Sequence, residues 1–344
     1  MKKLCPYGTH RVIAPINVLP QAADRIDATM HCEVNEILID VHTLNIDSAS
    51  FHQIKEACNQ DKDMMKKMIT DIVKNKGKMQ NPVTKSGGML IGAVIEKGAQ
   101  FHDKNLQVGT KIATLVSLSL TPLQIDEVLD INLDNEQVTI KGKAILFDSG
   151  IYAEIPKDLS EKLVLAALDV AGAPAQVKHL AKPGETVFII GAAGKSGLLC
   201  AYQAKLSVGE TGRVIGLVNE VEQVNLLKST GFCDDIIYHD AKDSIGVYHK
   251  VRDITQGALA DLTLNVVNVH DTEMASILST KDQGIVYFFS MATMFTKAAL
   301  GAEGIGKDVQ MIIGNGYTKN HAEITLDIVR KNKTIRDLFI NKYA

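Results

Sequence analysis

The stretch Glu185-Thr-Val-Phe-Ile-Ile-Gly-Ala-Ala-Gly-Lys-Ser-Gly197 decides the fold of this chain. Residues 187–190 form a short apolar run, typical of a buried strand, and the run stops at a cluster of glycines. From residue 198 the pattern LLCAYQAKL is that of a helix. A strand, a tight glycine-rich turn and a helix together present free backbone N–H groups to a pyrophosphate. The stretch therefore predicts a dinucleotide-binding turn.

The spacing within the turn is Ala192-x-Gly194-x-x-Gly197, a G-x-G-x-x-G pattern with alanine in the first place. Gly194 would let the backbone approach the phosphates, and Gly197 would let the helix pack closely on the strand. A P-loop is excluded because Ile189 stands where that motif needs a glycine. The alternative is a turn that merely joins strand to helix. A second strand at 213–218 and a helix up to 228 complete a β-α-β unit, which favours the dinucleotide site.

The bulk composition sets the class of protein. With 344 residues, 46% apolar and 22% charged, the chain has the composition of an ordinary globular protein and room for two domains. Its net charge of -3 gives no reason to expect a nucleic acid or an anionic membrane as partner. No apolar run approaches the roughly 18 residues of a membrane span, and the N-terminus lacks the apolar core of a secretory signal. The five cysteines are scattered, so we expect reduced thiols and a cytoplasmic location.

The chain divides into three parts by pattern. Residues 1–156 contain short strands separated by Gly, Asn and Asp turns, including strands at 138–140 and 144–147, which predicts a small, partly open β-barrel. Helices are expected at 51–58 and 61–76, the second closed by Gly77. Residues 157–305 alternate strands with helices, which predicts a doubly wound parallel sheet. Residues 306–344 read as a strand followed by one helix from 319 to 342, and we expect them to return to the first domain.

Several segments carry a resemblance to a known superfamily. The run APAQVKHLAKPGETVFIIGAAGKSG at 173–197 and GMLIGAVIE at 88–96 resemble the medium-chain dehydrogenase/reductases. That resemblance implies an α/β protein, with a GroES-like partly open β-barrel catalytic domain followed by a Rossmann dinucleotide-binding domain. Three longer strings, at 44–51, 77–92 and 314–325, resemble a narrower family, the L-erythro-3,5-diaminohexanoate dehydrogenases.

The narrower resemblance implies an activity. Enzymes of that family carry out NAD(P)-dependent oxidative deamination of L-erythro-3,5-diaminohexanoate to 5-amino-3-oxohexanoate and ammonia, a step of lysine degradation. The partner would then be a small diamino acid, and a homodimer is the default for such an enzyme. Two alternatives stay open: a zinc-free quinone or enoyl reductase of the same superfamily, and a non-catalytic dinucleotide-binding protein. The first of these would need an apolar pocket, whereas Asp47, Lys85 and His321 suggest charged substrate ends.

The resemblance also makes absences informative. Many superfamily members hold a catalytic zinc through a cysteine and a Gly-His-Glu segment. Here Asn45 stands near the cysteine place, and Gly88-Met89 stand at the His-Glu places. The closely spaced cysteines of a structural zinc lobe are missing too. We therefore expect an enzyme without zinc, in which no residue serves as a metal ligand.

The choice between NAD and NADP stays open at the level of sequence. An acidic residue at the end of the second strand usually binds the ribose of NAD, and Val218, Asn219 and Glu220 occupy that place. Lys195 could neutralise the pyrophosphate or the 2′-phosphate of NADP. The family resemblance favours NAD. The predicted cofactor-binding residues are Ala192, Ala193, Gly194, Lys195, Ser196, Gly197, Val218, Asn219, Glu220, Asn268, Ser290, Met291 and Ala292.

Oxidation of an amine constrains the catalytic residues. The substrate ammonium must lose a proton before hydride leaves, so a general base is needed. Asp47 is the first candidate, as base or as counter-charge, although it could simply cap the helix that follows. The other candidates are Asn45 and Ser48 in the same turn, Thr84 and Ser86 in a loop suited to a carboxylate, and Tyr317 and His321 after a Gly-Asn-Gly turn. The sequence leaves the identity of the base and the stereochemistry of the substrate open.

Overall fold

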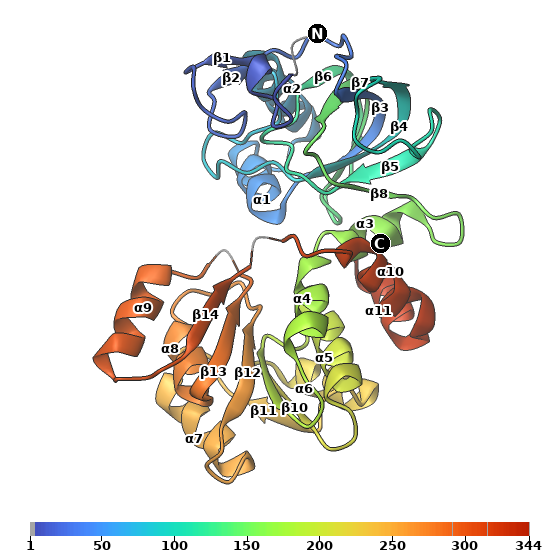
Figure 1. Ribbon diagram of the computed structural model, residues 1–344. Coiled ribbons are helices and arrows are strands. Elements are labelled where there is room, and N and C mark those ends of the chain that lie inside the picture. Colours follow the sequence, from blue (N-terminus) through green and yellow to red (C-terminus); the bar gives the residue numbers. More distant parts are fainter. Residues whose placement is uncertain (1–3, 291, 315, 344) are drawn as a thin grey trace. The chain divides into compact units, whose positions relative to one another are not determined.

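The computed structural model describes residues 4–290, 292–314 and 316–343. By their contacts the residues group into two compact units, Met1–Leu165 and Ala166–Ala344 (Figure 1). The first predicted boundary, after residue 156, lies close to this division. Each unit has its own sheet and its own buried core.

The first unit is built mainly of strands. It begins with the 3-10 helix η1 (Thr9–Arg11) and the small pair β1 (Val12–Ala14) and β2 (Arg25–Ile26). Its main elements are β3 (Glu36–Asn45), α1 (Ser48–Ala57), α2 (Lys62–Lys76), β4 (Met89–Lys97), β5 (Lys111–Thr114), β6 (Leu123–Ile131), β7 (Gln137–Phe147) and β8 (Tyr152–Glu154). Helix α3 (Glu161–Leu168) spans the division between the units.

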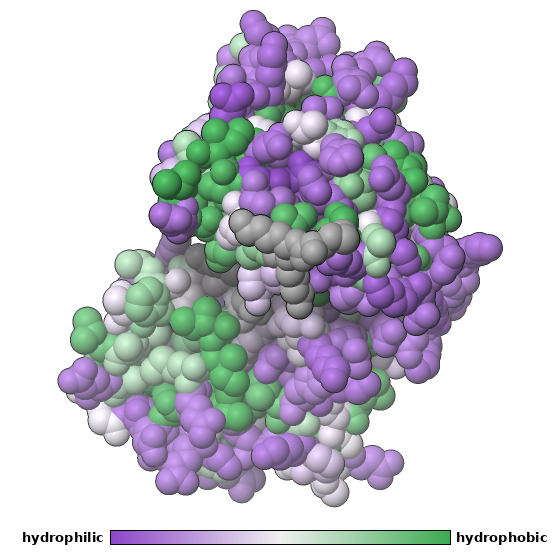
Figure 2. Space-filling view, turned by 45° about the horizontal axis from the view of Figure 1, so that its top comes forward, coloured by the Kyte–Doolittle hydropathy of each residue, from purple (hydrophilic) through white to green (hydrophobic). Residues whose placement is uncertain are grey.

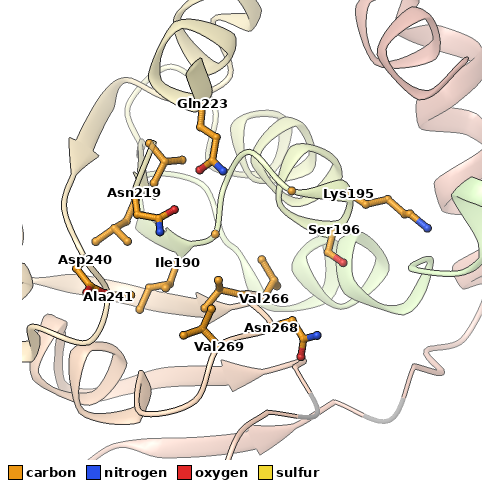
Figure 3. A pocket seen from close by; sticks show the side chains of 15 residues that line it. Ile190, Lys195, Ser196, Asn219, Gln223, Asp240, Ala241, Val266, Asn268 and Val269 are labelled. Atoms are coloured by element: carbon orange, nitrogen blue, oxygen red, sulfur yellow. The ribbon is translucent and has the colours of Figure 1, made fainter. Parts of the chain in front are cut away.

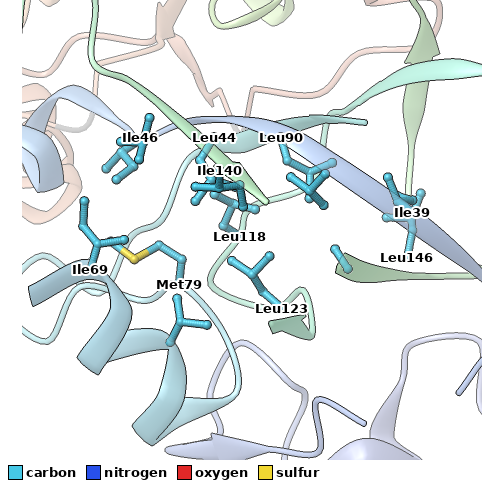
Figure 4. Packing of buried hydrophobic residues seen from close by; sticks show 14 of the residues in the cluster. Ile39, Leu44, Ile46, Ile69, Met79, Leu90, Leu118, Leu123, Ile140 and Leu146 are labelled. Carbon is cyan, nitrogen blue, oxygen red and sulfur yellow. The ribbon is translucent and has the colours of Figure 1, made fainter. Parts of the chain in front are cut away.

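Six of these strands form one antiparallel sheet in the order β6-β7-β3-β4-β5-β8. Alternate residues of β3, including Ile37, Ile39 and Val41, point into a core that Met65 and Ile69 of α2 complete. Figure 4 shows this packing around Leu44, Leu90 and Leu146. The two end strands do not pair with each other, which confirms the prediction of a partly open antiparallel β-structure.

The helices of the first unit begin and end at residues suited to those places. Asp61 caps α2 by accepting the N–H of Met64 at 2.9 Å. Gly77 ends the helix in the left-handed region, with φ 74°, as predicted. Asp47 caps α1, with its Oδ1 accepting the N–H of Ser50 at 3.0 Å.

The second unit alternates helices and strands. Its elements are α4 (Gly172–Leu180), β9 (Thr186–Ile190), α5 (Lys195–Val208), β10 (Arg213–Val218), α6 (Val221–Thr230), β11 (Asp235–Tyr238), α7 (Ser244–Ile254), β12 (Ala260–Asn265), α8 (Glu273–Ser279), β13 (Thr280–Phe288), α9 (Phe295–Gly304), β14 (Gln310–Ile313), α10 (His321–Lys331) and α11 (Lys333–Tyr343).

The strands of the second unit form one parallel sheet in the order β11-β10-β9-β12-β13-β14. The chain winds outward from β9 to β11, and then returns to β12 and winds the other way. Right-handed crossovers therefore place α5 and α6 on one face and α7 to α9 on the other, as Figure 1 shows. Phe188 and Ile190 of β9 accordingly pack with Val247 and Val251 of α7. This confirms the predicted doubly wound sheet, and it places a topological switch point between β9 and β12.

Several predicted elements differ in the structure. The segments expected as two strands at 138–140 and 144–147 are one strand, β7. The single C-terminal helix expected at 319–342 is two helices, because Asn332 ends α10 in an extended conformation. Residues 306–344 group with the second unit, where α10 contacts α4 and α11 contacts α5, whereas the sequence suggested a return to the first. No helix within the described residues is long and apolar enough to cross a membrane.

Candidate functional site: a dinucleotide pocket and a polar turn

The glycine-rich turn lies at the carboxyl end of β9, next to the switch point. Gly191 follows the strand with a φ of 87°, a conformation that side chains disfavour, and its carbonyl accepts the N–H of Gly194 at 3.2 Å. Gly194 is the N-cap of α5, and the N–H of Leu198 is bonded back to its carbonyl at 2.9 Å. The N–H groups of Lys195, Ser196 and Gly197 therefore belong to the first turn, which has no intrahelical acceptors.

The glycines of this turn differ in how much space surrounds them. A Cβ at Gly197 would lie 2.1 Å from the carbonyl oxygen of Gly191, so the helix approaches the turn too closely for any side chain. A Cβ at Gly194 would find its nearest neighbour, the same oxygen, at 3.5 Å. Gly194 is therefore open on the side from which a ligand approaches. A pyrophosphate fits this arrangement, because it needs free N–H groups and an unobstructed backbone.

A cavity of about 300 Å³ opens beside the turn (Figure 3). Its walls come from the ends of β9, β10 and β12, from the loop after β11 and from the first turns of α5 and α6. The lining residues are Ile190, Gly191, Gly194, Lys195, Ser196, Leu217, Val218, Asn219, Gln223, Asp240, Ala241, Val266, Val267, Asn268 and Val269. The carboxyl edge of a parallel sheet at its switch point is where such folds bind dinucleotides.

The structure gathers part of the predicted cofactor-binding set around this cavity. The residues that line it are Gly194, Lys195, Ser196, Val218, Asn219 and Asn268. Three predicted residues are buried and do not line the cavity: Ala192 and Ala193 within the turn, and Gly197 at the start of α5. Glu220 stands at the N-cap position of α6 without a side-chain capping bond, and its carboxylate accepts the side-chain N–H of Gln223 at 2.8 Å. Ser290 and Ala292 lie on the loop after β13, outside this cavity, and Met291 is outside the described residues.

Lys195 lines the cavity, but its ammonium group is directed elsewhere. The Nζ atom lies 2.8 Å from Asp169 Oδ2 and 5.6 Å from the centre of the Tyr343 ring. In Figure 3 the side chain extends away from Asn219 and Asn268. In this arrangement the Lys195 ammonium is paired with Asp169, and the groups of the turn that suit a phosphate are the backbone N–H groups at the start of α5.

Several cavity residues lie outside the set predicted from the sequence. They are Ile190, Gly191, Leu217, Gln223, Asp240, Ala241, Val266, Val267 and Val269. Most stand at or just after the end of a strand, so the strand ends were a usable signal. Gly191 was also visible in the sequence, since it directly follows the buried strand.

In the first unit, the predicted residues of the turn after β3 have distinct environments. Asn45 is buried at the end of β3, whereas Ser48 is exposed and donates to Glu136 Oε2 at 2.7 Å. Asp47 uses Oδ1 for the helix cap. Its Oδ2 is buried and has no hydrogen-bond partner in the described parts of the chain. A buried carboxylate oxygen without a donor is costly, so it marks a place where a ligand N–H would be stabilising.

Thr84 and Ser86 lie on a tight turn that packs against α1. The fully buried Asn81 holds the turn: its Oδ1 accepts the N–H of Val83 at 2.7 Å and of Thr84 at 3.3 Å. The carbonyl of Ser86 accepts the backbone N–H of Asn81 at 2.9 Å. Thr84 Oγ1 lies 2.6 Å from Ser50 Oγ, so the turn and the start of α1 form one hydrogen-bonded unit.

Tyr317 and His321 meet in the second unit, at the start of α10. Their rings pack edge to face with centroids 5.2 Å apart. Tyr317 is half exposed, but His321 is buried, and burial lowers the pKa of its imidazole. His321 is therefore a buried residue at the start of α10, in surroundings that disfavour the charged form of its imidazole.

Among the described residues, no group of three or more His, Cys, Asp or Glu side chains is arranged to hold a metal ion. The place of the zinc-ligating segment is also sterically closed. A Cβ at Gly88 would lie 2.0 Å from the carbonyl oxygen of Asn45, and the φ of Gly88 is 102°. Position 88 thus cannot carry a ligating side chain in this backbone conformation.

The parallel sheet with its glycine turn and the separate antiparallel unit define the class of the protein. It has the fold of the medium-chain dehydrogenase/reductases. Among solved structures it is similar to AibC (TM-score 0.57, 18% identity, 88% of this chain and 82% of that chain). It is also similar to an alcohol dehydrogenase from Thermotoga maritima (TM-score 0.54, 14% identity, 91% and 86% of the two chains). At these identities the similarity concerns the fold alone.

Sequence relatives identify the family. Residues 10–156 match the family model of the L-erythro-3,5-diaminohexanoate dehydrogenase N-terminal domain. The L-erythro-3,5-diaminohexanoate dehydrogenase of Acetoanaerobium sticklandii is 58% identical over 343 residues, 99% of each chain. The enzyme of the same name from Fusobacterium nucleatum is 56% identical over 344 residues, 100% of each chain. The chain belongs to the L-erythro-3,5-diaminohexanoate dehydrogenase family and is an oxidoreductase, which confirms the resemblance seen in the sequence.

Proposed function

We propose that this protein catalyses the NAD-dependent oxidative deamination of L-erythro-3,5-diaminohexanoate. In this reaction the diamino acid, water and NAD⁺ give 5-amino-3-oxohexanoate, ammonium, NADH and a proton. The observation that carries the proposal is the open glycine turn beside a cavity of about 300 Å³, in a chain 58% identical over 99% of its length to an enzyme of that name. The quinone or enoyl reductase and the non-catalytic protein remain outcomes of the test below.

The cavity walls favour NAD over NADP. Asn219 directly follows β10, where the adenine ribose is bound in this fold, and Gln223 in the first turn of α6 and Asp240 line the same cavity. Lys195 is the cation among the described lining residues, and it is paired with Asp169. The 2′-phosphate of NADP carries a charge of about −2, and in this cavity it would lie beside neutral amide groups and the carboxylate of Asp240. The ribose hydroxyls of NAD are better matched to these groups.

Asp47 is the residue proposed to engage the substrate amine. When bound, NAD supplies the hydride acceptor for C3. The protein must supply a base, because an ammonium cannot release hydride until it has lost a proton. The unpartnered Oδ2 of Asp47 is an acceptor for that proton or a counter-charge for the second ammonium, while Oδ1 stays fixed by the helix cap. Asn45 and Ser48 flank this carboxylate in sequence and shape the same turn.

The protein is further proposed to be a homodimer. Strand β14 is an edge of the parallel sheet and pairs with β13 on one side. Large apolar side chains near this edge are exposed: Ile313 to 64%, Phe295 to 64% and Leu300 to 68%. Figure 2 shows apolar residues gathered at the lower left of the view, among mostly polar ones. An open edge beside exposed apolar residues is a common surface for pairing with a second copy.

The test follows the two products together. Purified protein is mixed with L-erythro-3,5-diaminohexanoate and either NAD or NADP, and NADH absorbance and ammonia release are measured with and without a metal chelator. We expect equimolar NADH and ammonia with NAD, no effect of the chelator, and at least tenfold lower kcat/KM with NADP. Turnover of quinones with NADPH would establish the reductase instead. Cofactor binding without turnover of any substrate would establish the non-catalytic protein.

A further inference from the structure

The hydroxyl groups of Ser50 and Thr84 form a pair whose hydrogen-bond direction can be deduced. They lie 2.6 Å apart, so one of them donates to the other. Ser50 is fully buried, and within the described residues Thr84 is the hydrogen-bond partner of its hydroxyl. If Thr84 donated, the Ser50 hydrogen would be buried without an acceptor, which is costly. Ser50 therefore donates to Thr84, and the hydroxyl hydrogen of the half-buried Thr84 is free for a ligand.

The Thr84 hydroxyl is also a stronger donor than an isolated one. Its oxygen lies 3.4 Å from the N–H of Ser86 and accepts the hydrogen of Ser50. A hydroxyl that accepts hydrogen bonds is polarised, so it donates more strongly in turn. The chain of donors thus runs from the interior of α1, through Ser50 and Thr84, toward the surface.

Asn81 makes this donor rigid. Its Nδ2 donates to Gln53 Oε1 at 2.7 Å and to the carbonyl of Ser50 at 3.3 Å, while its Oδ1 holds the backbone of the 83–84 turn. Asn81 is fully buried and uses all of its donors and acceptors. The position of the Thr84 hydroxyl relative to the start of α1 is therefore fixed before any ligand arrives. Preorganisation of this kind lowers the free-energy cost of binding.

We infer that Thr84 is the donor for the carboxylate of the substrate, with Ser50 polarising it and Asn81 positioning it. The inference rests on the proposed function, because it assigns the other end of the same diamino acid. Asp47 and Ser50 are three residues apart at the start of α1, so they lie on one face of that helix. The unpartnered Asp47 oxygen suits an ammonium group, and the Thr84 hydroxyl suits a carboxylate. A diamino acid carries an ammonium group and a carboxylate, so one such ligand can bind to the Asp47 oxygen and to the Thr84 hydroxyl.

The test compares the substrate with its carboxamide, 3,5-diaminohexanamide, in wild type and in Thr84→Val. Valine keeps the shape of threonine and removes the hydroxyl. For the acid we expect Thr84→Val to raise KM about 10- to 100-fold, the usual effect of losing a hydrogen bond to a charged group. For the amide we expect a change of less than about threefold. Thr84→Ser should restore the acid KM, and the KM for NAD should stay unchanged in all variants.

Ser50→Ala supplies the matched second variant. Acting through Thr84, it should raise the acid KM by a smaller factor, and the double variant Ser50→Ala/Thr84→Val should be no worse than Thr84→Val alone. The double variant removes both hydroxyls, so neither is left buried and unpaired. Equal effects of Thr84→Val on acid and amide, or no rescue by Thr84→Ser, would overturn the inference.

Calorimetric titration of the acid and the amide separates this inference from the proposed function. If wild type does not oxidise diaminohexanoate but binds the acid in a Thr84-dependent manner, the proposed reaction fails and the carboxylate site stands. If the acid is oxidised but its binding does not depend on Thr84, the reaction stands and the carboxylate site fails.

Discussion

Asp47 uses its two carboxylate oxygens differently, and substitutions can separate the two uses. Oδ1 caps α1, whereas the buried Oδ2 is the proposed partner of the substrate amine. Asparagine is as good an N-cap as aspartate, but it carries no charge. We expect Asp47→Asn to lower kcat/KM for the diamino acid at least about 100-fold, with stability unchanged. Asp47→Ala should add a loss of about 1 kcal/mol in the free energy of unfolding.

Steady-state kinetics and urea unfolding of both Asp47 variants check this expectation. The KM for NAD serves as the internal control. An Asp47→Asn enzyme with wild-type turnover would show that the residue is a helix cap without a catalytic role.

His321 gives a prediction about pH. Burial lowers the pKa of His321 in the folded protein, whereas in the unfolded chain it titrates near the usual value of about 6.5. The unfolded state therefore binds the proton more readily, and stability is lost as pH falls through that value. Compared with His321→Gln, the wild type should lose free energy of unfolding between pH 7.5 and 5.5, by at most about 1.4 kcal/mol per pH unit. The free energy of unfolding is measured by chemical denaturation across this pH range in both proteins. The same pH dependence in wild type and His321→Gln would contradict this prediction.

At the scale of elements, the glycine turn before α5 predicts opposite results for two similar substitutions. Gly194→Ala has room within the protein, so the variant should fold normally but raise the KM for NAD about tenfold or more, because the added methyl meets the phosphate. Gly197→Ala places its methyl 2.1 Å from the carbonyl of Gly191 and should cost about 1–3 kcal/mol of stability. Kinetics with varied NAD and thermal unfolding measure the two effects. Equal behaviour of the variants would refute the assignment.

The elements also show which parts of the fold a sequence can specify. The strand, turn and helix around Gly194 were predictable because each follows from local residue types. Gly142 is the reason that two strands, 138–140 and 144–147, are predicted in place of one. The structure has one continuous strand, β7, and a Cβ at Gly142 would lie 2.3 Å from the carbonyl oxygen of Gln124 on β6. Glycine is needed at position 142 because β6 lies so close, and β6 is not among the strands predicted from the sequence.

The candidate site has the same division between local and distant causes. The phosphate-binding turn and the cap at Asp47 are encoded by neighbouring residues, so the sequence indicated both. The pairing of Lys195 with Asp169, and the contact of Ser50 with Thr84, join residues 26 and 34 positions apart. Such contacts are set by packing of elements, and no periodicity or spacing in one sequence predicts them.

At the scale of the whole molecule, the exposed edge of the parallel sheet predicts how copies assemble. In a two-fold dimer each substitution occurs twice at the interface, so one charge per chain is strongly unfavourable. Lysine is also the residue that natural edge strands use to prevent pairing. We therefore expect Ile313→Lys on β14 to convert a dimer to a monomer at micromolar concentration. Leu206→Lys on α5, where the side chain is 59% exposed, is the matched control and should leave the dimer intact.

Analytical ultracentrifugation of the wild type and both variants measures the mass directly. If the wild type is a monomer at all concentrations, the homodimer is excluded. If Ile313→Lys stays dimeric, the interface lies elsewhere and the β14 edge is free. NAD binding gives a further reading, because the cavity is lined by the ends of β9, β10 and β12, the loop after β11 and the first turns of α5 and α6, and β14 contributes none of its lining residues. A monomeric Ile313→Lys variant should thus still bind NAD, with a dissociation constant within about threefold of wild type, since surface substitutions away from a site rarely change its free energy by more than about 0.5 kcal/mol.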